Sequence, residues 1–270
     1  MQFTKSPAIP AILACLVATL ITRPIPASAN PPPKDLPLAG ETFLIENRTA
    51  FVILPPEELR KKPQPWVLYA PTLPGLPGKA ELWMFDRFTK AGVAIAGIDV
   101  GESYGNPKGR ALYSALHEEL GVRRGFSTKP VLLARSRGGL MTLCWAAEHA
   151  DKVGGFAGVY PVCNIASYPG VSRAAGAYQM SPEELTSRLA EHNPIDRLGD
   201  LAKAKIPFFA IHGDVDSLVP LAANSGELQK RYEALGGTFE LVIPKGQGHN
   251  MWPGFFECEE LVQFVLKHAK

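Results

Sequence analysis

The chain has 270 residues, enough for one large α/β domain or two small ones. Its 28 Lys and Arg residues nearly balance 26 Asp and Glu residues, and no basic block is present. Nucleic acid is therefore excluded as an expected partner. The four cysteines lack paired Cys-x-x-Cys spacing, which excludes the common zinc-binding patterns. The composition is therefore that of a globular protein with a net charge close to zero.

Residues 1–29 have the pattern of a secretory signal peptide. Lys5 supplies a positive start, residues 8–21 form an apolar run of 14, and residues 27–29 (Ala-Ser-Ala) form a small-residue cleavage site. A membrane-spanning helix needs about 20 apolar residues, so the run indicates export without a stable span after processing. We expect a periplasmic or extracellular protein.

Short apolar runs alternate with helix-forming segments through residues 30–270, and no repeat or second linker divides this part of the chain. Strands are expected at 42–46, 50–54, 66–70, 93–100, 131–134, 153–160, 207–212 and 239–243. Helices are expected at 80–91, 110–120, directly after Ser136, 221–235 and 255–267. The alternation predicts one α/β domain with a mainly parallel sheet covered on both faces.

Residues 164–200 interrupt this alternation. They include one well-marked helix start, with Ser181 as the N-cap and Pro182 in the first turn. An insertion of this length between two strands is typical of a small lid over a site. The alternative is a surface excursion that only protects the sheet.

Ser136 comes directly after an expected strand and before two glycines and a helix. Residues 134–138 (ARSRG) fit the small-x-Ser-x-Gly pattern of a nucleophile elbow, with Ala in place of the commoner first Gly. A serine hydroxyl is a weak nucleophile, so it needs an exposed position and a base within hydrogen-bond reach. A sharp strand-to-helix turn gives that position. Because an ordinary helix N-cap can look the same, the partners of Ser136 decide its role.

Acidic and histidine partners follow Ser136, each just beyond an expected strand. Asp214 and Asp216 lie in one loop, and His249 lies in the next, glycine-rich loop. The order Ser, Asp, His is that of a hydrolase triad with His249 as general base. Together, His212, Asp214 and Asp216 also fit a metal site, but His212 ends a buried strand, so no metal is expected.

These residues make the chain resemble the α/β-hydrolase superfamily over nearly all of residues 40–270. Secreted esterases and the catalytic domains of prolyl-oligopeptidase-like peptidases are the most similar members. The resemblance implies an α/β-hydrolase fold with an eight-stranded, mostly parallel sheet, a site at its carboxyl edge and no cofactor. The family's D-x-x-V-P spelling implies that the catalytic acid is Asp216, three residues before Val219. Asp214 is then a turn residue.

An oxyanion hole needs two N–H donors near the substrate carbonyl. One is expected from Arg137, the residue after the serine, and the other from the loop at 71–78. Proline has no N–H, so Thr72 and Leu73 are the first available donors of that loop.

Two arginines flank the serine, and their role has two interpretations. The guanidinium of Arg137 can stabilise the oxyanion or bind a substrate carboxylate, and a similar Ser-Arg pair occurs in glucuronoyl esterases. Alternatively, Arg135 and Arg137 pair with acids of neighbouring loops such as Asp99 and Glu102. Tyr104, in the loop that carries Glu102, is expected to border the cleft and bind substrate.

Three cysteines, Cys144, Cys163 and Cys258, remain after processing. Export permits one disulfide bond, and an odd number leaves one thiol over. A bond between Cys163 and Cys258 is conceivable, with Cys144 left free in the helix after the serine.

The sequence favours an exported serine hydrolase that cleaves carboxylic esters, with an acylated carbohydrate or polysaccharide as the expected substrate partner. In this hypothesis Ser136 attacks the acyl carbon, His249 transfers the proton and Asp216 orients the imidazole. Three alternatives are a prolyl-oligopeptidase-like peptidase, a glucuronoyl-type esterase acting on uronic acid esters, and a non-catalytic binding protein on the same fold. The sequence carries no signature of an oligomeric state.

Overall fold

The computed structural model describes residues 1–2 and 34–270. The expected signal peptide, apart from its first two residues, lies outside the described residues. None of the helices in the described part of the chain is long and apolar enough to cross a membrane.

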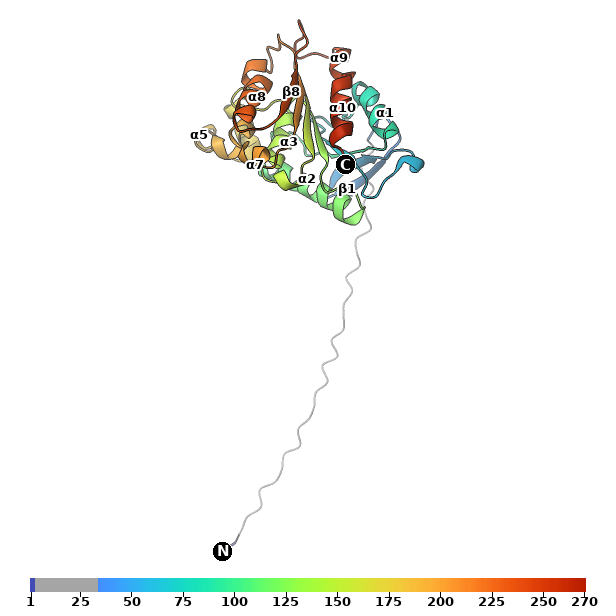
Figure 1. Cartoon of the computed structure of the whole chain (residues 1–270). Helices are drawn as coiled ribbons and strands as arrows, with labels where there is room; N and C mark the ends of the chain where they lie inside the picture. The colour runs from blue at the N-terminus through green and yellow to red at the C-terminus, as the bar shows by residue number, and fades with distance from the viewer. Residues whose placement is uncertain (3–33) are drawn as a thin grey trace.

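An eight-stranded sheet forms the centre of the fold (Figure 1). Its strands are β1 Glu41–Ile45, β2 Arg48–Ile53, β3 Trp66–Tyr69, β4 Ala94–Ile98, β5 Val131–Arg135, β6 Gly155–Val159, β7 Phe208–Ile211 and β8 Phe239–Val242. They are ordered β1-β2-β4-β3-β5-β6-β7-β8, and only the pairings of β1 with β2 and of β2 with β4 are antiparallel. The predicted eight-stranded, mostly parallel sheet is confirmed.

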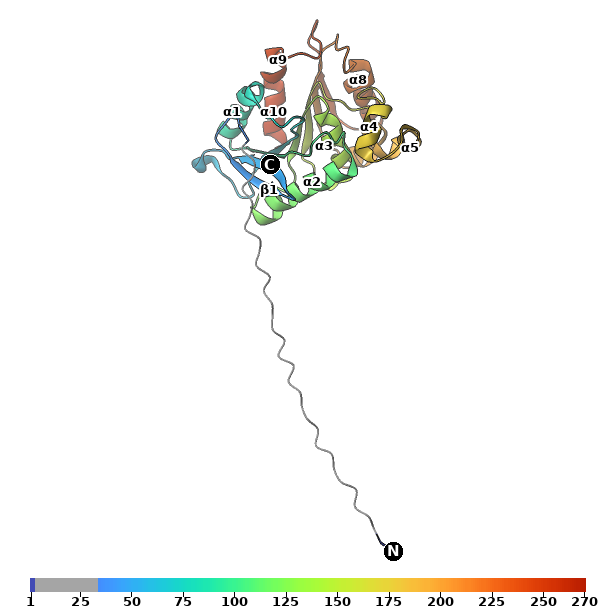
Figure 2. The ribbon, with the colours of Figure 1, turned by 180° about the vertical axis from the view of Figure 1, so that it is seen from behind.

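Helices cover both faces of the sheet (Figures 1 and 2). They are α1 Leu82–Lys90, α2 Pro107–Glu118, α3 Gly138–Ala146, α4 Val171–Tyr178, α5 Pro182–Ser187, α6 Leu189–His192, α7 Gly199–Lys203, α8 Ser225–Ala234, α9 Pro253–Phe256 and α10 Glu259–His268. Short helical turns are η1 Glu57–Leu59, η2 Lys79–Glu81, η3 Glu119–Arg123, η4 Ala150–Lys152, η5 Pro194–Asp196 and η6 Leu221–Ala223. One apolar layer packs α2, α3, α7 and α8 on the sheet, and a second packs α1, α9 and α10 on the other face.

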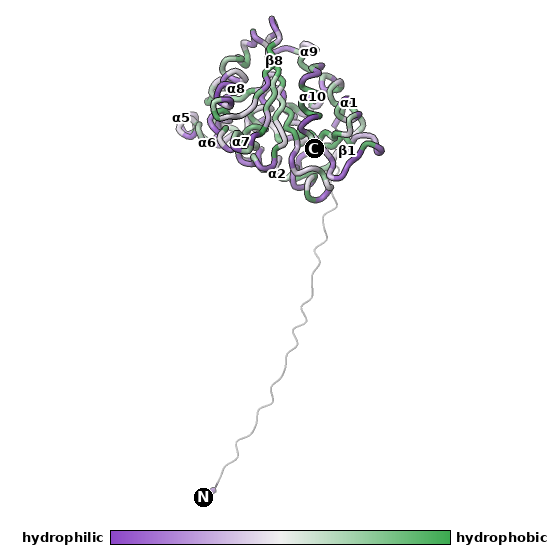
Figure 3. The backbone as a smooth tube through the Cα atoms, in the orientation of Figure 1, coloured by the Kyte–Doolittle hydropathy of each residue, from purple (hydrophilic) through white to green (hydrophobic). Residues whose placement is uncertain are grey.

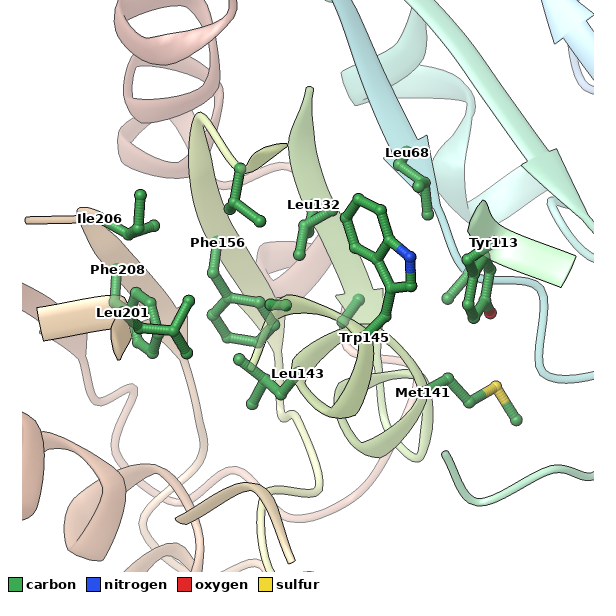
Figure 4. Packing of buried hydrophobic residues seen from close by; sticks show 14 of the residues in the cluster. Leu68, Tyr113, Leu132, Met141, Leu143, Trp145, Phe156, Leu201, Ile206 and Phe208 are labelled. Atoms are coloured by element: carbon green, nitrogen blue, oxygen red, sulfur yellow. The ribbon is translucent and has the colours of Figure 1, made fainter. Parts of the chain in front are cut away.

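Strands β3, β4, β6 and β7 are apolar along their whole length because both of their faces are buried. Figure 3 shows the hydrophobic residues gathered in the central strands. On the face covered by α3, Trp145 and Leu143 of the helix lie among Leu132, Phe156 and Phe208 of neighbouring strands (Figure 4). This packing fixes α3, and with it the position of the residues at its start.

Two of the expected helices are each divided in two. The helix expected at 221–235 breaks at Asn224, whose buried side chain accepts hydrogen bonds from the backbone N–H of Cys163 and donates to Ser167. The helix expected at 255–267 breaks at Cys258, whose sulfur accepts from the N–H of Leu261 and caps α10. The break at Cys258 thus has a local side-chain cap, whereas the break at Asn224 is held by contacts with a segment about 60 residues away in the sequence.

The insertion at 164–200 folds into α4, α5, α6, η5 and the start of α7. Ser181 caps α5 as expected, with its Oγ accepting from the N–H of Glu184 at 3.1 Å. Figure 2 shows α4 and α5 at the margin of the molecule, next to α2 and α3. Ile165 and Leu185 of the insertion share a small apolar cluster with Leu140 of α3 and Val219. The insertion thus abuts the helix after the serine, and its role as a lid stays a prediction.

The disulfide considered between Cys163 and Cys258 is not formed: both are buried free thiols, as is Cys144. Cys163 belongs to the apolar layer beneath α3 and α8, whereas Cys258 belongs to the layer beneath α1 and α10. The sheet therefore lies between the two sulfur atoms. Sequence separation gave no indication of which face each cysteine would occupy.

Candidate active site

Ser136 occupies the sharp turn between β5 and α3. Its backbone has φ +53°, a left-handed conformation that non-glycine residues rarely adopt. The turn is held by hydrogen bonds from Ser136 N–H to the carbonyl of Val159 (3.0 Å) and from the N–H of Val162 to the carbonyl of Ser136 (2.8 Å). Gly139 is required here because a Cβ at this position would clash with the Val162 carbonyl. The turn presents the Ser136 hydroxyl at the carboxyl edge of the sheet.

His249 and Asp216 reach Ser136 from the loops after β8 and β7. The Ser136 Oγ lies 2.9 Å from Nε2 of His249, and the His249 Nδ1 lies 2.8 Å from Oδ2 of Asp216. An ionised carboxylate only accepts hydrogen bonds, so Nδ1 carries the proton and Nε2 accepts from the serine. The structure brings together the three residues that the sequence singled out, in the geometry of a nucleophile, a base and an orienting acid.

Asp216, and not Asp214, contacts the histidine. Burial would raise the pKa of Asp216, but hydrogen bonds from His212, His249 and the backbone N–H of Val219 together lower it well below its ordinary 3.8. Asp214 instead accepts from the N–H of Gly246 at 2.7 Å. The carboxylate beside His249 is therefore ionised at neutral pH, and Asp214 closes the turn, as the sequence analysis expected.

Two side chains that contact the triad were not assigned to it from the sequence: Tyr160 was not singled out, and His212 was considered only as a metal ligand. Tyr160, which follows β6, lays its ring against His249 with centroids 4.3 Å apart. His212, which ends β7, is fully buried with Nε2 3.3 Å from the same Asp216 oxygen that His249 uses. His212 and Tyr160 each ended an expected strand, at 207–212 and 153–160, and Tyr160 belonged to no motif.

The expected oxyanion donors lie on two adjacent segments. Thr72 is buried and its carbonyl accepts from the Arg137 guanidinium at 3.2 Å, which ties the loop after β3 to the elbow. The side chain of Leu73 is more than half exposed. Within residues 34–270, the backbone N–H groups of Thr72, Leu73 and Arg137 have no hydrogen-bond acceptor. These three donors are free to bind an anionic oxygen.

Both arginines beside Ser136 are engaged by carboxylates. Arg137 Nε lies 2.7 Å from Glu102, and Arg135 Nη1 lies 3.0 Å from the buried Glu81. Burial raises the pKa of Glu102, and the nearby Arg137 opposes this rise. Of the acids named in advance, Glu102 is thus a partner, whereas Asp99 pairs with Lys34 at 3.0 Å.

Tyr104 does not line the site with its side chain as expected. It is 6% exposed and lies in the apolar cluster shared by α3 and the insertion. Its carbonyl accepts from the hydroxyl of Tyr178 on α4 at 2.9 Å. Tyr104 therefore ties the loop after β4 to the insertion, because a tyrosine ring gains more from burial in that cluster than from exposure.

Apolar side chains surround the three residues. Five of the exposed large hydrophobic residues come from the loops that carry the site: Leu73, Val215, Leu218, Met251 and Trp252. In the described part of the chain, no three His, Cys, Asp or Glu side chains are grouped so as to hold a metal ion. The five side chains form an exposed apolar surface on the loops that carry the site.

A serine, a histidine and an aspartate linked in this order at the carboxyl edge of such a sheet define a serine hydrolase with the α/β-hydrolase fold. The model of the prolyl oligopeptidase family matches residues 127–270, more than half of the chain. The chain therefore belongs to the prolyl oligopeptidase family.

Solved structures with the same fold differ in length. Dipeptidyl peptidase 4 of Porphyromonas gingivalis is 14% identical with a TM-score of 0.67, and the match covers 85% of this chain and 35% of that one. Est1E from Butyrivibrio proteoclasticus is 18% identical with a TM-score of 0.63, and the match covers 85% of this chain and 98% of Est1E. An S-formylglutathione hydrolase from Agrobacterium tumefaciens is 13% identical with a TM-score of 0.68, covering 86% and 95%. The chain thus spans about a third of the peptidase. A comparison with curated proteins found no match.

Proposed function

We propose that this serine hydrolase cleaves carboxylic esters through an acyl-enzyme at Ser136. The observation that carries the proposal is the hydrogen-bond chain from Ser136 Oγ through the His249 ring to Asp216, with links of 2.9 and 2.8 Å. In the first step His249 takes the serine proton while Oγ attacks the acyl carbon. His249 then gives that proton to the departing alkoxide, and the alcohol leaves.

The second step regenerates the enzyme with water. His249 takes a proton from the water, the hydroxide adds to the acyl carbon, and Ser136 leaves as its proton returns, releasing the carboxylic acid. In both steps the carbonyl oxygen becomes negative. We assign the stabilisation of this charge to the N–H of Arg137 together with that of Thr72 or Leu73. Asp216 stays ionised and holds the tautomer of His249.

The charges near Ser136 favour an ester substrate over a peptide that is bound through its N-terminal ammonium group. A free carboxylate would favour binding of a substrate ammonium group, but Glu81 and Glu102 are paired with Arg135 and Arg137. The exposed apolar side chains of the site loops add a surface for an uncharged acyl or alcohol group. An acylated carbohydrate is the substrate class we propose.

Membership of the prolyl oligopeptidase family supports a second candidate, a serine peptidase. The same triad hydrolyses amides when the substrate is held correctly, and dipeptidyl peptidase 4 shares the fold. A glucuronoyl-type esterase is supported less well, because a substrate carboxylate bound by Arg137 would have to replace Glu102, 2.7 Å away. A non-catalytic protein would have no need of the strained backbone at Ser136.

A panel of matched substrates separates these candidates. We would compare acetyl and feruloyl sugar esters, a methyl glucuronate ester and aminoacyl anilides with one preparation of the protein. The proposal expects the highest kcat/KM for a neutral sugar ester. An aminoacyl anilide with a kcat/KM equal to or above that of every ester would establish the peptidase, and a clear preference for the uronate ester would establish the glucuronoyl type.

We also propose that the protein is exported and acts as a single domain from residue 30 onward. The support is the pattern at 1–29, with Lys5 and no acidic residue before an apolar run. Expression of the full chain in a bacterial host, followed by N-terminal sequencing, tests this. Export predicts a secreted or periplasmic product that begins near Asn30. An intact N-terminus in the cytoplasmic fraction would contradict it.

A further inference from the structure

His212 contacts the triad from inside the protein. Its side chain is fully buried, and its Nε2 lies 3.3 Å from Oδ2 of Asp216. The Nδ1 of His249 lies 2.8 Å from the same oxygen. Two histidines therefore converge on one carboxylate oxygen, and only one of them touches Ser136.

The tautomer of His212 follows from its partners. Its Nε2 lies 2.8 Å from the carbonyl oxygen of Val219, which can only accept a hydrogen bond, so Nε2 carries a proton. Its Nδ1 lies 2.8 Å from the Ser225 hydroxyl, which can donate to it. The Nε2–H group thus donates to the Val219 carbonyl, and the same nitrogen lies 3.3 Å from Oδ2 of Asp216, the longer of the two contacts.

The Asp216 carboxylate is surrounded by N–H groups. Its Oδ1 accepts from the backbone of Leu218 at 3.0 Å and of Val219 at 2.8 Å, and its Oδ2 faces the two histidines. The two backbone donors fix one oxygen and leave the orientation of the other to His212 and His249. His249 keeps Nδ1–H toward Asp216 while its Nε2 gains and loses the reacting proton, so its ring changes charge during the reaction. The contacts of His212 take no part in that proton transfer.

We propose that His212 is a positioning residue of the hydrolase: it holds Oδ2 of Asp216 toward Nδ1 of His249 and limits how strongly this carboxylate stabilises the protonated imidazole. The inference rests on the proposed function of the triad. It adds a fourth side chain to the site, one that acts through Asp216 and never touches substrate.

Loss of His212 is expected to change the pH dependence of kcat/KM through the charge on Asp216. Two side chains face the pair formed by His249 and Asp216: His212 contacts Asp216, and Tyr160 contacts His249. The charged guanidinium of Arg135 lies near Tyr160. Loss of the His212 donor leaves more negative charge on Oδ2 of Asp216. This carboxylate then holds the protonated form of His249 more strongly. The acid limb of kcat/KM, which reports loss of the proton from the base, moves to higher pH.

Three variants of the full protein test the proposal. His212→Leu removes the donor, His212→Gln keeps an N–H group near the position of Nε2, and Ser225→Ala is the matched control that removes only the partner of Nδ1. Rates with one ester are measured across the pH range, and folding is checked by circular dichroism. We expect His212→Leu to lose about 10- to 100-fold in kcat, the scale seen for groups that orient a reacting side chain, with KM nearly unchanged and the acid limb at higher pH. His212→Gln and Ser225→Ala should retain the wild-type limb.

An acid limb of His212→Leu that coincides with that of the wild type would overturn the proposal, as would a shift that His212→Gln fails to reverse. If His212→Leu does not fold, His212→Asn takes its place, since its shorter amide does not reach the position of Nε2. It should show the shifted limb, and an unshifted limb overturns the proposal equally. Activity that survives Ser136→Ala would instead refute the triad itself, a separate result because His212 is intact in that variant.

Discussion

The ring of Tyr160 lies against the imidazole of His249, with centroids 4.3 Å apart and planes inclined at 52°. Tyr160 is itself held edge-on by Phe255, with centroids 4.9 Å apart. The histidine comes from a loop whose other side is exposed, so this packed ring is the support that fixes its orientation. We therefore expect the rate of the reaction to depend on a side chain that takes no part in proton transfer.

Replacing Tyr160 by Ala removes that support. We expect kcat/KM for an ester to fall about 10- to 100-fold, the cost of a small misplacement of a reacting group. Tyr160→Phe keeps the ring and should keep the wild-type rate. Steady-state kinetics on the three proteins test this. Equal rates for Tyr160→Ala and the wild type would show that the loop alone holds His249.

Glu81 and Arg135 form a buried ion pair at 3.0 Å beneath the elbow. Glu81 also accepts from the hydroxyl of Tyr69 at 3.0 Å and the N–H of Gly78 at 2.8 Å. Glu81→Ala leaves a buried charge without its partner, so we expect the free energy of unfolding to fall by about 3–5 kcal/mol. Urea unfolding measures this loss.

The matched control for that variant is Glu259→Ala, which breaks the exposed pair of Glu259 with Arg87 at 3.6 Å. Exposed pairs contribute about 0–1 kcal/mol, so the control should unfold nearly as the wild type does. Similar losses for Glu81→Ala and Glu259→Ala would contradict the structural role assigned to the buried pair.

The lowered pKa of Asp216 predicts a loss of stability in acid. The folded-state pKa lies below the ordinary 3.8, so ionised Asp216 stabilises the folded protein fully at neutral pH. This contribution is lost as the pH falls below about 3.8 toward the folded-state pKa. Urea unfolding should show that the free energy of unfolding falls less between pH 7 and pH 3 for Asp216→Asn than for the wild type. Asp214→Asn serves as the control and should lose as much as the wild type, whereas equal losses in all three proteins would refute the assignment.

The three described cysteines should resist thiol reagents. Burial raises the pKa of Cys144 and of Cys258 to about 11 each, and raises that of Cys163 further. A thiolate is the reactive form, so Ellman's reagent at pH 8 should label these residues only after denaturation. Peptide mapping without reductant should find no bond between Cys163 and Cys258. A linked peptide pair would contradict the placement of these residues on opposite faces of the sheet.

All eight strands could be predicted from the sequence. The central strands β3, β4, β6 and β7 are continuous apolar runs because both of their faces are buried, and the edge strands β1 and β8 are short runs rich in residues typical of strands. The contact between Ser136 and His249 was also predictable, since each lies beyond a strand of one parallel sheet and such ends share an edge. The positions at which two of the expected helices break could not be predicted from the sequence. Asn224 breaks a helix through bonds to a segment that the sequence does not place beside it, and Cys258 starts α10 through a sulfur cap, for which cysteine is not a usual residue.

The surroundings of the site depended on three-dimensional packing. Glu81 as the partner of Arg135 lies 54 residues away on η2, and nothing in its local sequence distinguishes it from an exposed acid. Tyr104 was expected at the cleft because its loop borders the site, but the loop turns its ring into the cluster under α4. Direction of a side chain within a loop is set by tertiary contacts, which have no local signature.

Turnover of a simple ester such as p-nitrophenyl acetate by Ser136→Ala tests the central claim most directly, with active-site labelling by a fluorophosphonate as the companion readout. The triad predicts that kcat/KM falls by about 10⁴-fold or more and that labelling is lost. A Ser136→Ala protein that retains ester turnover within about tenfold of the wild type would contradict the assignment of Ser136 as the nucleophile.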